Sequence, residues 1–181
     1  MGKVYDAITD KLAAWIAEQK LFFTATAPLA ESGRINCSPK GMDSFRILDP
    51  HTVAYLDLTG SGAETIAHLR ENGRIVVMFC AFDGPARIVR LHGLGEVLEA
   101  GTPAYEALAG RFPEMPGARS IIRIEVGRVS DSCGYGVPVY EYKENRDTLE
   151  KWAARKGEDG IREYWRANNA TSIDGLPGLK G

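Results

Sequence analysis

The chain has 181 residues, of which 44% are hydrophobic and 25% are charged. These proportions are typical of one folded domain and exclude disordered, collagen-like and coiled-coil proteins. The formal net charge of −2 is far from the strongly basic balance that general nucleic-acid binding requires, so we expect no nucleic-acid partner. A local basic pocket for a small anion is compatible with this charge.

The cysteines and the hydropathy pattern give further expectations. Cys37, Cys80 and Cys133 have no metal-ligand spacing, so we expect free thiols and no metal site, with Cys37 and Cys80 facing the core. No signal-peptide pattern is visible, and the longest apolar run, residues 75–82, is too short to cross a bilayer as a helix. We therefore expect a cytoplasmic protein with no membrane partner.

The first predicted element is an amphipathic helix. Its apolar residues recur three or four positions apart from Val4 to Ile16, which places them on one helical face. Four short strand-like runs follow, at residues 21–27, 34–38, 44–48 and 52–58. The turns between these runs are too short for parallel crossovers, so the pattern favours antiparallel connections.

A second helix is predicted to begin at the sequence Ser-Gly-Ala-Glu. Ser61 stands at the expected N-cap and Glu64 three positions later, which is the spacing of a capping box, and Gly73 marks the end of the helix. Two longer strands, at residues 74–82 and 87–99, are joined by a tight turn.

The C-terminal part is predicted to hold a short helix, one more strand and a helical extension. Thr102 followed by Pro103 indicates the start of the short helix, and residues 121–130 alternate as a strand. Two further helices are expected near 147–156 and 159–168. Apolar residues in the turn-rich segment that follows favour its attachment to the protein surface.

Together these elements predict a single α+β domain over residues 1–181, with a C-terminal helical extension from about 140 to 181. Its six or seven antiparallel strands form a sheet long enough to curl into a barrel. One capped helix lies in the middle of the strand order, and helices flank both ends.

Two segments have residue types suited to an anionic ligand. In the run at 34–38, Arg34, Asn36 and Ser38 alternate onto one strand face, and Lys40 follows the strand end. A solvent-exposed strand face gives the same pattern equally often. As a residue at a strand end, Lys40 is expected to pack little and to contribute little to stability.

The second segment is the glycine-rich turn that enters the helix after residue 60, with Ser61, Gly62 and Thr65. Free backbone N–H groups and the positive end of a helix dipole suit a phosphate, although a plain capped helix is the alternative. One hairpin separates the two segments, so they could share a pocket. Asp57, an acid in an apolar strand, is interpreted as a turn former at the strand end. No spacing of histidines or cysteines identifies a catalytic residue.

In this order and spacing, the motifs resemble the pyridoxamine 5′-phosphate oxidase-like superfamily of FMN-binding split β-barrels. The resemblance covers about residues 5–130 and is firmest over 34–98. The sequences Cys-Gly-Tyr-Gly-Val-Pro at 133–138 and Ser-Ile-Asp-Gly-Leu-Pro at 172–177 are similar to an oxidase-related branch of unknown substrate.

This resemblance implies an α+β antiparallel split β-barrel with flanking helices, and a homodimer with FMN at the subunit interface. It also implies an oxidoreductase that acts on a small molecule which the sequence does not identify. The basic residues would contact the phosphate or the ring. The strand amide and hydroxyl would contact the ring edge, and the residues at the start of the helix would contact the phosphate. The implied cofactor-binding residues are Arg34, Asn36, Ser38, Lys40, Ser61, Gly62 and Thr65.

The chain departs from the pattern of true oxidases at two places. Glu64-Thr65 stands where they have an Arg-Lys pair, and their C-terminal Arg-Leu-x-Pro-type segment is absent. Authentic pyridoxamine 5′-phosphate oxidase activity is therefore not expected. The alternatives to FMN-dependent turnover are a deazaflavin or haem in the same barrel, flavin binding without catalysis, or a dimeric interaction module.

Overall fold

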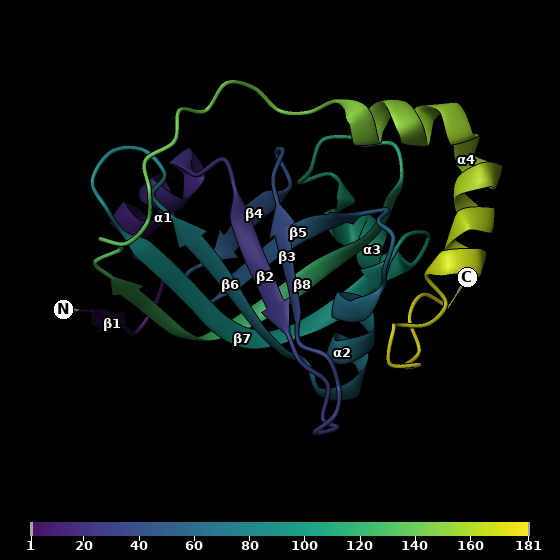
Figure 1. The fold of residues 1–181 in the computed structure, drawn as a ribbon, viewed down its shortest axis with the longest axis horizontal. Coiled ribbons are helices and arrows are strands. Elements are labelled where there is room, and N and C mark those ends of the chain that lie inside the picture. Colours follow the sequence, from purple (N-terminus) through teal and green to yellow (C-terminus); the bar gives the residue numbers. More distant parts are fainter. Residues whose placement is uncertain (1, 181) are drawn as a thin grey trace.

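The computed structural model describes residues 2–180, which form one antiparallel sheet and four helices (Figure 1). The strands are β1 (Lys3–Tyr5), β2 (Phe22–Thr26), β3 (Asn36–Lys40), β4 (Phe45–Asp49), β5 (Thr52–Leu58), β6 (Arg74–Cys80), β7 (Ile88–Glu99) and β8 (Ala118–Ser132). The helices are α1 (Asp10–Glu18), α2 (Glu64–Asn72), α3 (Pro103–Ala109) and α4 (Thr148–Asn168).

The eight strands form a curled sheet that stays open along one side. Their order is β3-β2-β6-β7-β8-β5-β4, with β1 paired to β8, and every pairing is antiparallel. Within residues 2–180, β3 and β4 at the two ends of this order do not pair with each other. The predicted α+β split barrel is therefore confirmed, with eight strands in place of six or seven.

The extra strand lies where the sequence pattern predicts a helix. Val4 belongs to β1 and is half exposed, and it pairs with Ser130 of β8. The helix begins only at Asp10, where the hydroxyl of Thr9 accepts the N–H of Leu12 at 3.3 Å. The predicted start of the helix was wrong because strand pairing with β8, more than a hundred residues away in sequence, overrode the helical spacing of the local apolar residues.

An apolar core fills the inside of the curl. Its centre is a cluster of aromatic rings whose neighbouring centroids lie 5.0–5.7 Å apart, formed by Phe22, Phe45, Tyr55 and Phe79. Leu12 and Ile16 of α1 close this core at one end. Burial of such side chains contributes about 1.5–3 kcal/mol each, so this core is a main source of stability.

A second, smaller core explains why β5 is buried on both faces. Val53 and Tyr55 face the barrel interior, whereas Ala54 and Leu56 face the cluster beneath α3. The sequence run at 52–58 accordingly lacks the polar alternation of a half-exposed strand.

The C-terminal region matches its predicted outline. α4 consists of two helical sections that meet at Gly157, which has a φ of 67°, and the bend is visible in Figure 1. After α4, the backbone N–H groups of Gly178 and Leu179 donate to the carbonyls of Ala170 and Asn169. Leu179 is buried, so the expected attachment of this segment is confirmed.

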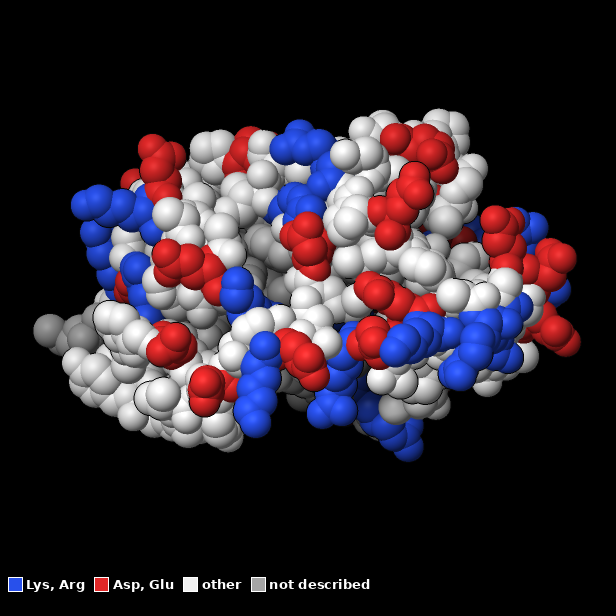
Figure 2. Space-filling view, turned by 90° about the horizontal axis from the view of Figure 1, so that it is seen from above, with Lys and Arg blue, Asp and Glu red and all other residues white. Residues whose placement is uncertain are grey.

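The face of the molecule above the sheet carries both positively and negatively charged residues. Figure 2 shows Lys and Arg interspersed with Asp and Glu over α4 and the segment before it, without one continuous basic area on that face. None of the helices in residues 2–180 is long and apolar enough to cross a membrane.

Candidate functional site

Three of the predicted site residues lie on the inner side of β3. Asn36, Ser38 and Lys40 pair across the sheet with Thr26, Thr24 and Phe22 of β2, whose side chains are buried inside the barrel. Lys40 is therefore part of the strand and on the same face as Asn36, not beyond the strand end. Cross-strand neighbours share a face, so this edge of the interior is polar.

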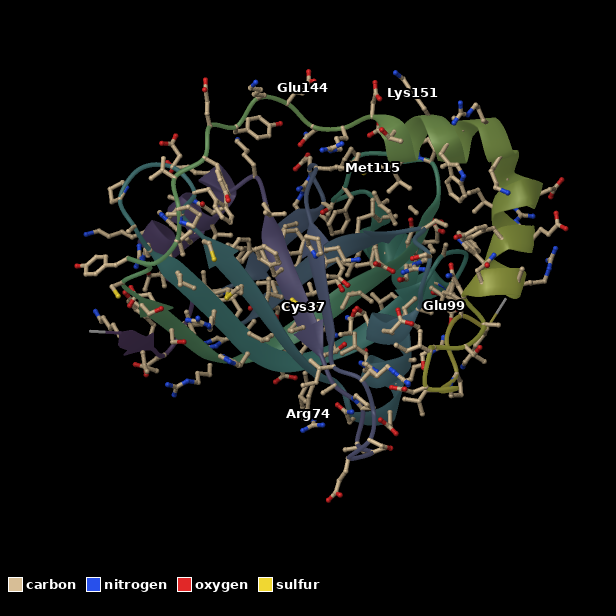
Figure 3. The ribbon with its side chains drawn as sticks, viewed as in Figure 1. Cys37, Arg74, Glu99, Met115, Glu144 and Lys151 are labelled. Atoms are coloured by element: carbon tan, nitrogen blue, oxygen red, sulfur yellow. The ribbon has the colours of Figure 1, made fainter. Side chains whose placement is uncertain are left out.

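Two expectations about this segment are wrong. The strand begins at Asn36, so Arg34 precedes it, and the Arg34 side chain is 65% exposed. Cys37 is exposed rather than buried (labelled in Figure 3). The reason is that the polar side of β3 faces inward, which turns Cys37 outward and reverses the expected faces. Cys80 is in the core, as expected, and Cys133 is exposed.

Asn36 connects β3 to α2 through hydrogen bonds. Its amide nitrogen Nδ2 donates to the hydroxyl of Thr65 at 2.9 Å and to that of Thr26 at 3.3 Å, and its Oδ1 accepts the hydroxyl of Ser38 at 3.0 Å. The hydroxyl of Thr26 also lies 2.9 Å from Nδ1 of the fully buried His68. Burial lowers the pKa of His68, so its imidazole is neutral at pH 7.

Three buried polar atoms near this network have no hydrogen-bond partner in the described residues: Thr24 Oγ1, Tyr55 OH and His68 Nε2. Burial, followed by the charge of Asp57, raises the pKa of Tyr55 well above its ordinary value. The hydroxyls of Thr24 and Thr65 lie near the Tyr55 hydroxyl and partly offset this rise in its pKa, but neither makes a hydrogen bond of good geometry with it. Unpartnered buried groups are rare, and they mark a place where water or a ligand can complete the bonding.

A buried ion cluster beside this network connects β3 with β5 and β8. Asp57 has no exposed surface; its Oδ1 lies 2.9 Å from Nζ of Lys40 and its Oδ2 2.7 Å from Nε of Arg119. Burial favours the protonated acid, but the two cations outweigh it and lower the pKa of Asp57 to about 2. Asp57 is therefore not a turn former, and Lys40 has a structural role that its position in the sequence did not indicate.

The turn before α2 differs from a capping box. α2 begins at Glu64 with Ala63 as its N-cap, and no side chain in residues 2–180 caps it, so Ser61 is not the N-cap. The Glu64 carboxylate accepts the N–H of Ile173 at 3.3 Å and lies over Gly62, where a Cβ would collide with it. Contact with the C-terminal segment thus takes Glu64 away from the reciprocal bond that a capping box needs.

A cavity of about 450 Å³ brings the two predicted segments together. Arg34, Asn36, Ser61 and Gly62 line it, with Glu64 and residues of the C-terminal segment. Of the other predicted residues, Thr65 contacts Asn36 directly, whereas Lys40 points to Asp57. The expected shared pocket between β3 and the start of α2 is present.

Sequence reasoning missed Arg119, His68 and Asp174 at this site. The signal for Arg119 and Asp57 was available, because a charged residue inside an apolar strand requires a partner of opposite charge. Asp174 carried no such signal, since it lies in a turn-rich segment 140 residues from its partner Arg34. The described residues contain no group of three or more His, Cys, Asp or Glu arranged for a metal ion.

Comparison with known proteins shows the family of this chain. A family model described as pyridoxamine 5′-phosphate oxidase matches residues 8–133. The chain belongs to the pyridoxamine 5′-phosphate oxidase family. A relative from Aspergillus flavus, the pyridoxamine 5′-phosphate oxidase family protein ustO, is 42% identical over an alignment of 194 residues that covers 97% of this chain and 77% of the relative.

Solved structures of this family's fold are also similar. The HupZ protein of Group A Streptococcus is 26% identical with a TM-score of 0.52, over 67% of this chain and 91% of that one. An FAD-binding protein from Mesorhizobium loti is 14% identical with a TM-score of 0.50, over 72% of this chain and 96% of that one. At that identity the second similarity concerns the fold alone.

Proposed function

We propose that this member of the pyridoxamine 5′-phosphate oxidase family is a flavin-dependent oxidoreductase with FMN as its cofactor. The observation that carries the proposal is the cavity between β3 and the start of α2, which unites Arg34, Asn36, Ser61 and Gly62. Residues from two separate segments supply guanidinium, amide, hydroxyl and backbone N–H groups there. These groups suit a ligand with a polar ring edge at one end and a phosphate at the other.

The residues fit such a ligand in two parts. Toward the barrel, Asn36 lines the cavity with an amide that bonds to Ser38 and Thr65, next to buried hydroxyls that lack partners, and this polar side suits a ring edge. Toward the surface, Arg34 and Ser61 suit a phosphate, but the guanidinium of Arg34 is paired with Asp174. The phosphate end is therefore complete only when that pair opens.

A bound flavin supplies hydride-transfer chemistry, and the protein contributes binding, orientation and exclusion of water. Asn36 is the central positioning group, because Thr26, Ser38 and Thr65 all hold its side-chain amide. His68 supports Thr26 from the core side and, as a neutral imidazole, adds no charge. No residue is assigned as a catalytic acid or base.

We also infer a homodimer. β6 is apolar on both faces: Val77 and Phe79 lie in the core, while Val76 and Met78 point outward and are half-buried. A hollow of about 420 Å³ lies over this outer face and extends across β2 and β7. Figure 1 draws no helix across it in the described chain. A strand apolar on both faces requires a cover on both, and a second subunit provides one.

The dimer is expected to bury more than about 2,000 Å² in total. Light scattering or sedimentation at low micromolar concentration measures it. A monomer that still binds FMN stoichiometrically would contradict the inference and remove the interface from the cofactor site.

An absorbance spectrum of the purified protein, with mass analysis of the released ligand, tests the cofactor. Blue absorption that follows FMN supports the proposal, whereas a Soret band or a deazaflavin mass replaces it with an alternative. In titrations of the apo-protein, FMN is expected to bind more tightly than riboflavin, since a charge-assisted phosphate contact contributes about 1.5–3 kcal/mol. Failure to bind any flavin would contradict the proposed function.

A further inference from the structure

The segment after α4 forms a small hairpin that reaches the candidate site. In this tail hairpin, residues 171–177, Thr171 bridges to Pro177 and the N–H of Ser172 donates to the carbonyl of Leu176 at 2.9 Å. Gly175, with a φ of 77°, makes the reversal of direction. Asp174 lies at the tip, and the N–H of its neighbour Ile173 donates to Glu64 in the cavity wall.

Asp174 accepts hydrogen bonds from two donors of Arg34. One carboxylate oxygen accepts the backbone N–H of Arg34 at 2.7 Å, and the other accepts the guanidinium. The backbone N–H and then the guanidinium lower the pKa of Asp174, so the carboxylate is ionised at pH 7. Two oxygens of a phosphate could accept from this same pair of donors, because carboxylates and phosphates use a guanidinium in the same way.

The charge balance of the cavity also depends on Asp174. Arg34 and Glu64 are the charged residues that line it, so Asp174 leaves two carboxylates against one guanidinium. A dianionic phosphate is disfavoured by that balance. With Asp174 away from Arg34, one carboxylate opposes one guanidinium, and backbone N–H groups add favourable dipoles.

We propose that Asp174 is a specificity-determining residue of the flavin pocket, an internal carboxylate that competes with the flavin phosphate for Arg34. This inference rests on the proposed function. The C-terminal segment then controls how strongly the pocket distinguishes phosphorylated from unphosphorylated flavin. Binding of FMN then requires the tail hairpin to release Arg34, whereas binding of riboflavin does not.

The attachments of the tail hairpin suit such a release. Both ends are fixed: buried Asn169 bonds to Arg119 and to the carbonyl of Gly60, and the Gly178 carbonyl accepts from Arg70, which also pairs with Glu99 (labelled in Figure 3). The tip, in contrast, meets the cavity wall only through the polar contacts of Ile173 and Asp174, among the hydrogen bonds of the described residues. The Ile173 side chain is 63% exposed. A segment with few buried apolar contacts opens at low cost while its ends stay bound.

The test compares FMN and riboflavin affinities of the wild-type apo-protein and Asp174→Asn. The amide keeps the shape and removes the charge, so FMN is expected to bind about ten-fold more tightly, with riboflavin unchanged within about two-fold. Asp159→Asn on α4, an equal charge change on a fully exposed side chain, is the matched control and should alter neither affinity. In an Arg34→Ala background, Asp174→Asn should bring a smaller gain, because only the repulsion between the carboxylate and the phosphate is removed there. Unchanged or weaker FMN binding by Asp174→Asn overturns the inference.

Hydrogen exchange gives a readout that does not depend on affinity. Saturating FMN, but not riboflavin, is expected to speed exchange of the amides at 172–176 in the wild-type protein; slower exchange would mean that the hairpin closes over the phosphate instead. If no variant binds any flavin, the proposed function fails, and inorganic phosphate decides the inference alone. Tighter phosphate binding by Asp174→Asn than by wild type supports it, and equal binding overturns it.

Discussion

Two acid–base contacts near β3 look alike in sequence and differ in physical character. Lys40 pairs with Asp57, which has no exposed surface and also binds Arg119. Arg34, six positions earlier, pairs with Asp174 at the surface, where its own side chain is 65% exposed. Both cations were expected to contact the phosphate or the ring of a flavin. Only the surface cation is in a position to exchange its partner.

Solvent explains the difference. A buried charge has lost its hydration, so removal of its partner leaves an uncompensated ion in a medium of low dielectric constant. In the Arg34–Asp174 pair the carboxylate is only 14% exposed, but the guanidinium is 65% exposed and screened by water, so Arg34 can exchange its partner at lower cost. The cluster around Asp57 therefore connects β3 with β5 and β8, and the Arg34–Asp174 pair can respond to a ligand.

The largest expected effect breaks the buried cluster. Asp57→Ala leaves Lys40 and Arg119 without their shared carboxylate, and we expect it to lower the free energy of unfolding by about 3–5 kcal/mol. Urea unfolding measures this loss. Asp174→Ala is the control at the exposed pair and should leave the midpoint nearly unchanged. Equal losses in the two variants would contradict the distinction between them.

Acid should also weaken the buried cluster around Asp57. The pKa of Asp57 is lowered to about 2, so its contribution is fully present above the unfolded pKa near 4 and is lost as the pH falls toward 2. The expected loss from this group is about 2 kcal/mol. Unfolding free energies of wild type and Asp57→Asn measured from pH 5 to pH 2 should therefore converge at low pH. A constant gap would show that Asp57 does not titrate in this range.

A smaller loss is expected for Lys40→Ala. Arg119 still neutralises Asp57 in this variant, so the cost is one charge-assisted hydrogen bond, about 1.5 kcal/mol. Thermal or urea unfolding of the apo-protein measures it, with Lys11→Ala on the exposed side of α1 as the control. If Lys40→Ala causes no loss of stability, Lys40 is not structural and is available to bind the cofactor, as its position in the sequence predicts.

The smallest effect concerns Ser61, in the same cavity as Arg34. Because Ser61 is not the N-cap of α2, Ser61→Ala should change the free energy of unfolding by less than about 0.5 kcal/mol while it weakens FMN binding. Thr102→Ala is the matched comparison: Thr102 caps α3 and accepts the N–H of Tyr105, so about 1 kcal/mol should be lost. A loss of that size in Ser61→Ala would mean that Ser61 caps α2 after all.

Local patterns in the sequence were sufficient for the elements whose causes are local. Alternating residues, Gly73 at the end of α2 and Thr102-Pro103 at the start of α3 depend on neighbours within a few positions, and these predictions are confirmed. The succession of such elements, together with the resemblance to a family, was enough to predict an α+β split barrel and a polar pocket between β3 and α2.

The partners of the charged residues were decided by tertiary structure alone. Asp57 meets Arg119 across β5 and β8, and Arg34 meets Asp174 from the far end of the chain. Pairings over such distances in sequence depend on how the sheet curls and where the chain returns, and no local period encodes either. The sequence by itself therefore determined which residues could bind an anion, whereas the fold decided which cation is buried in an ion pair and which can still exchange its partner.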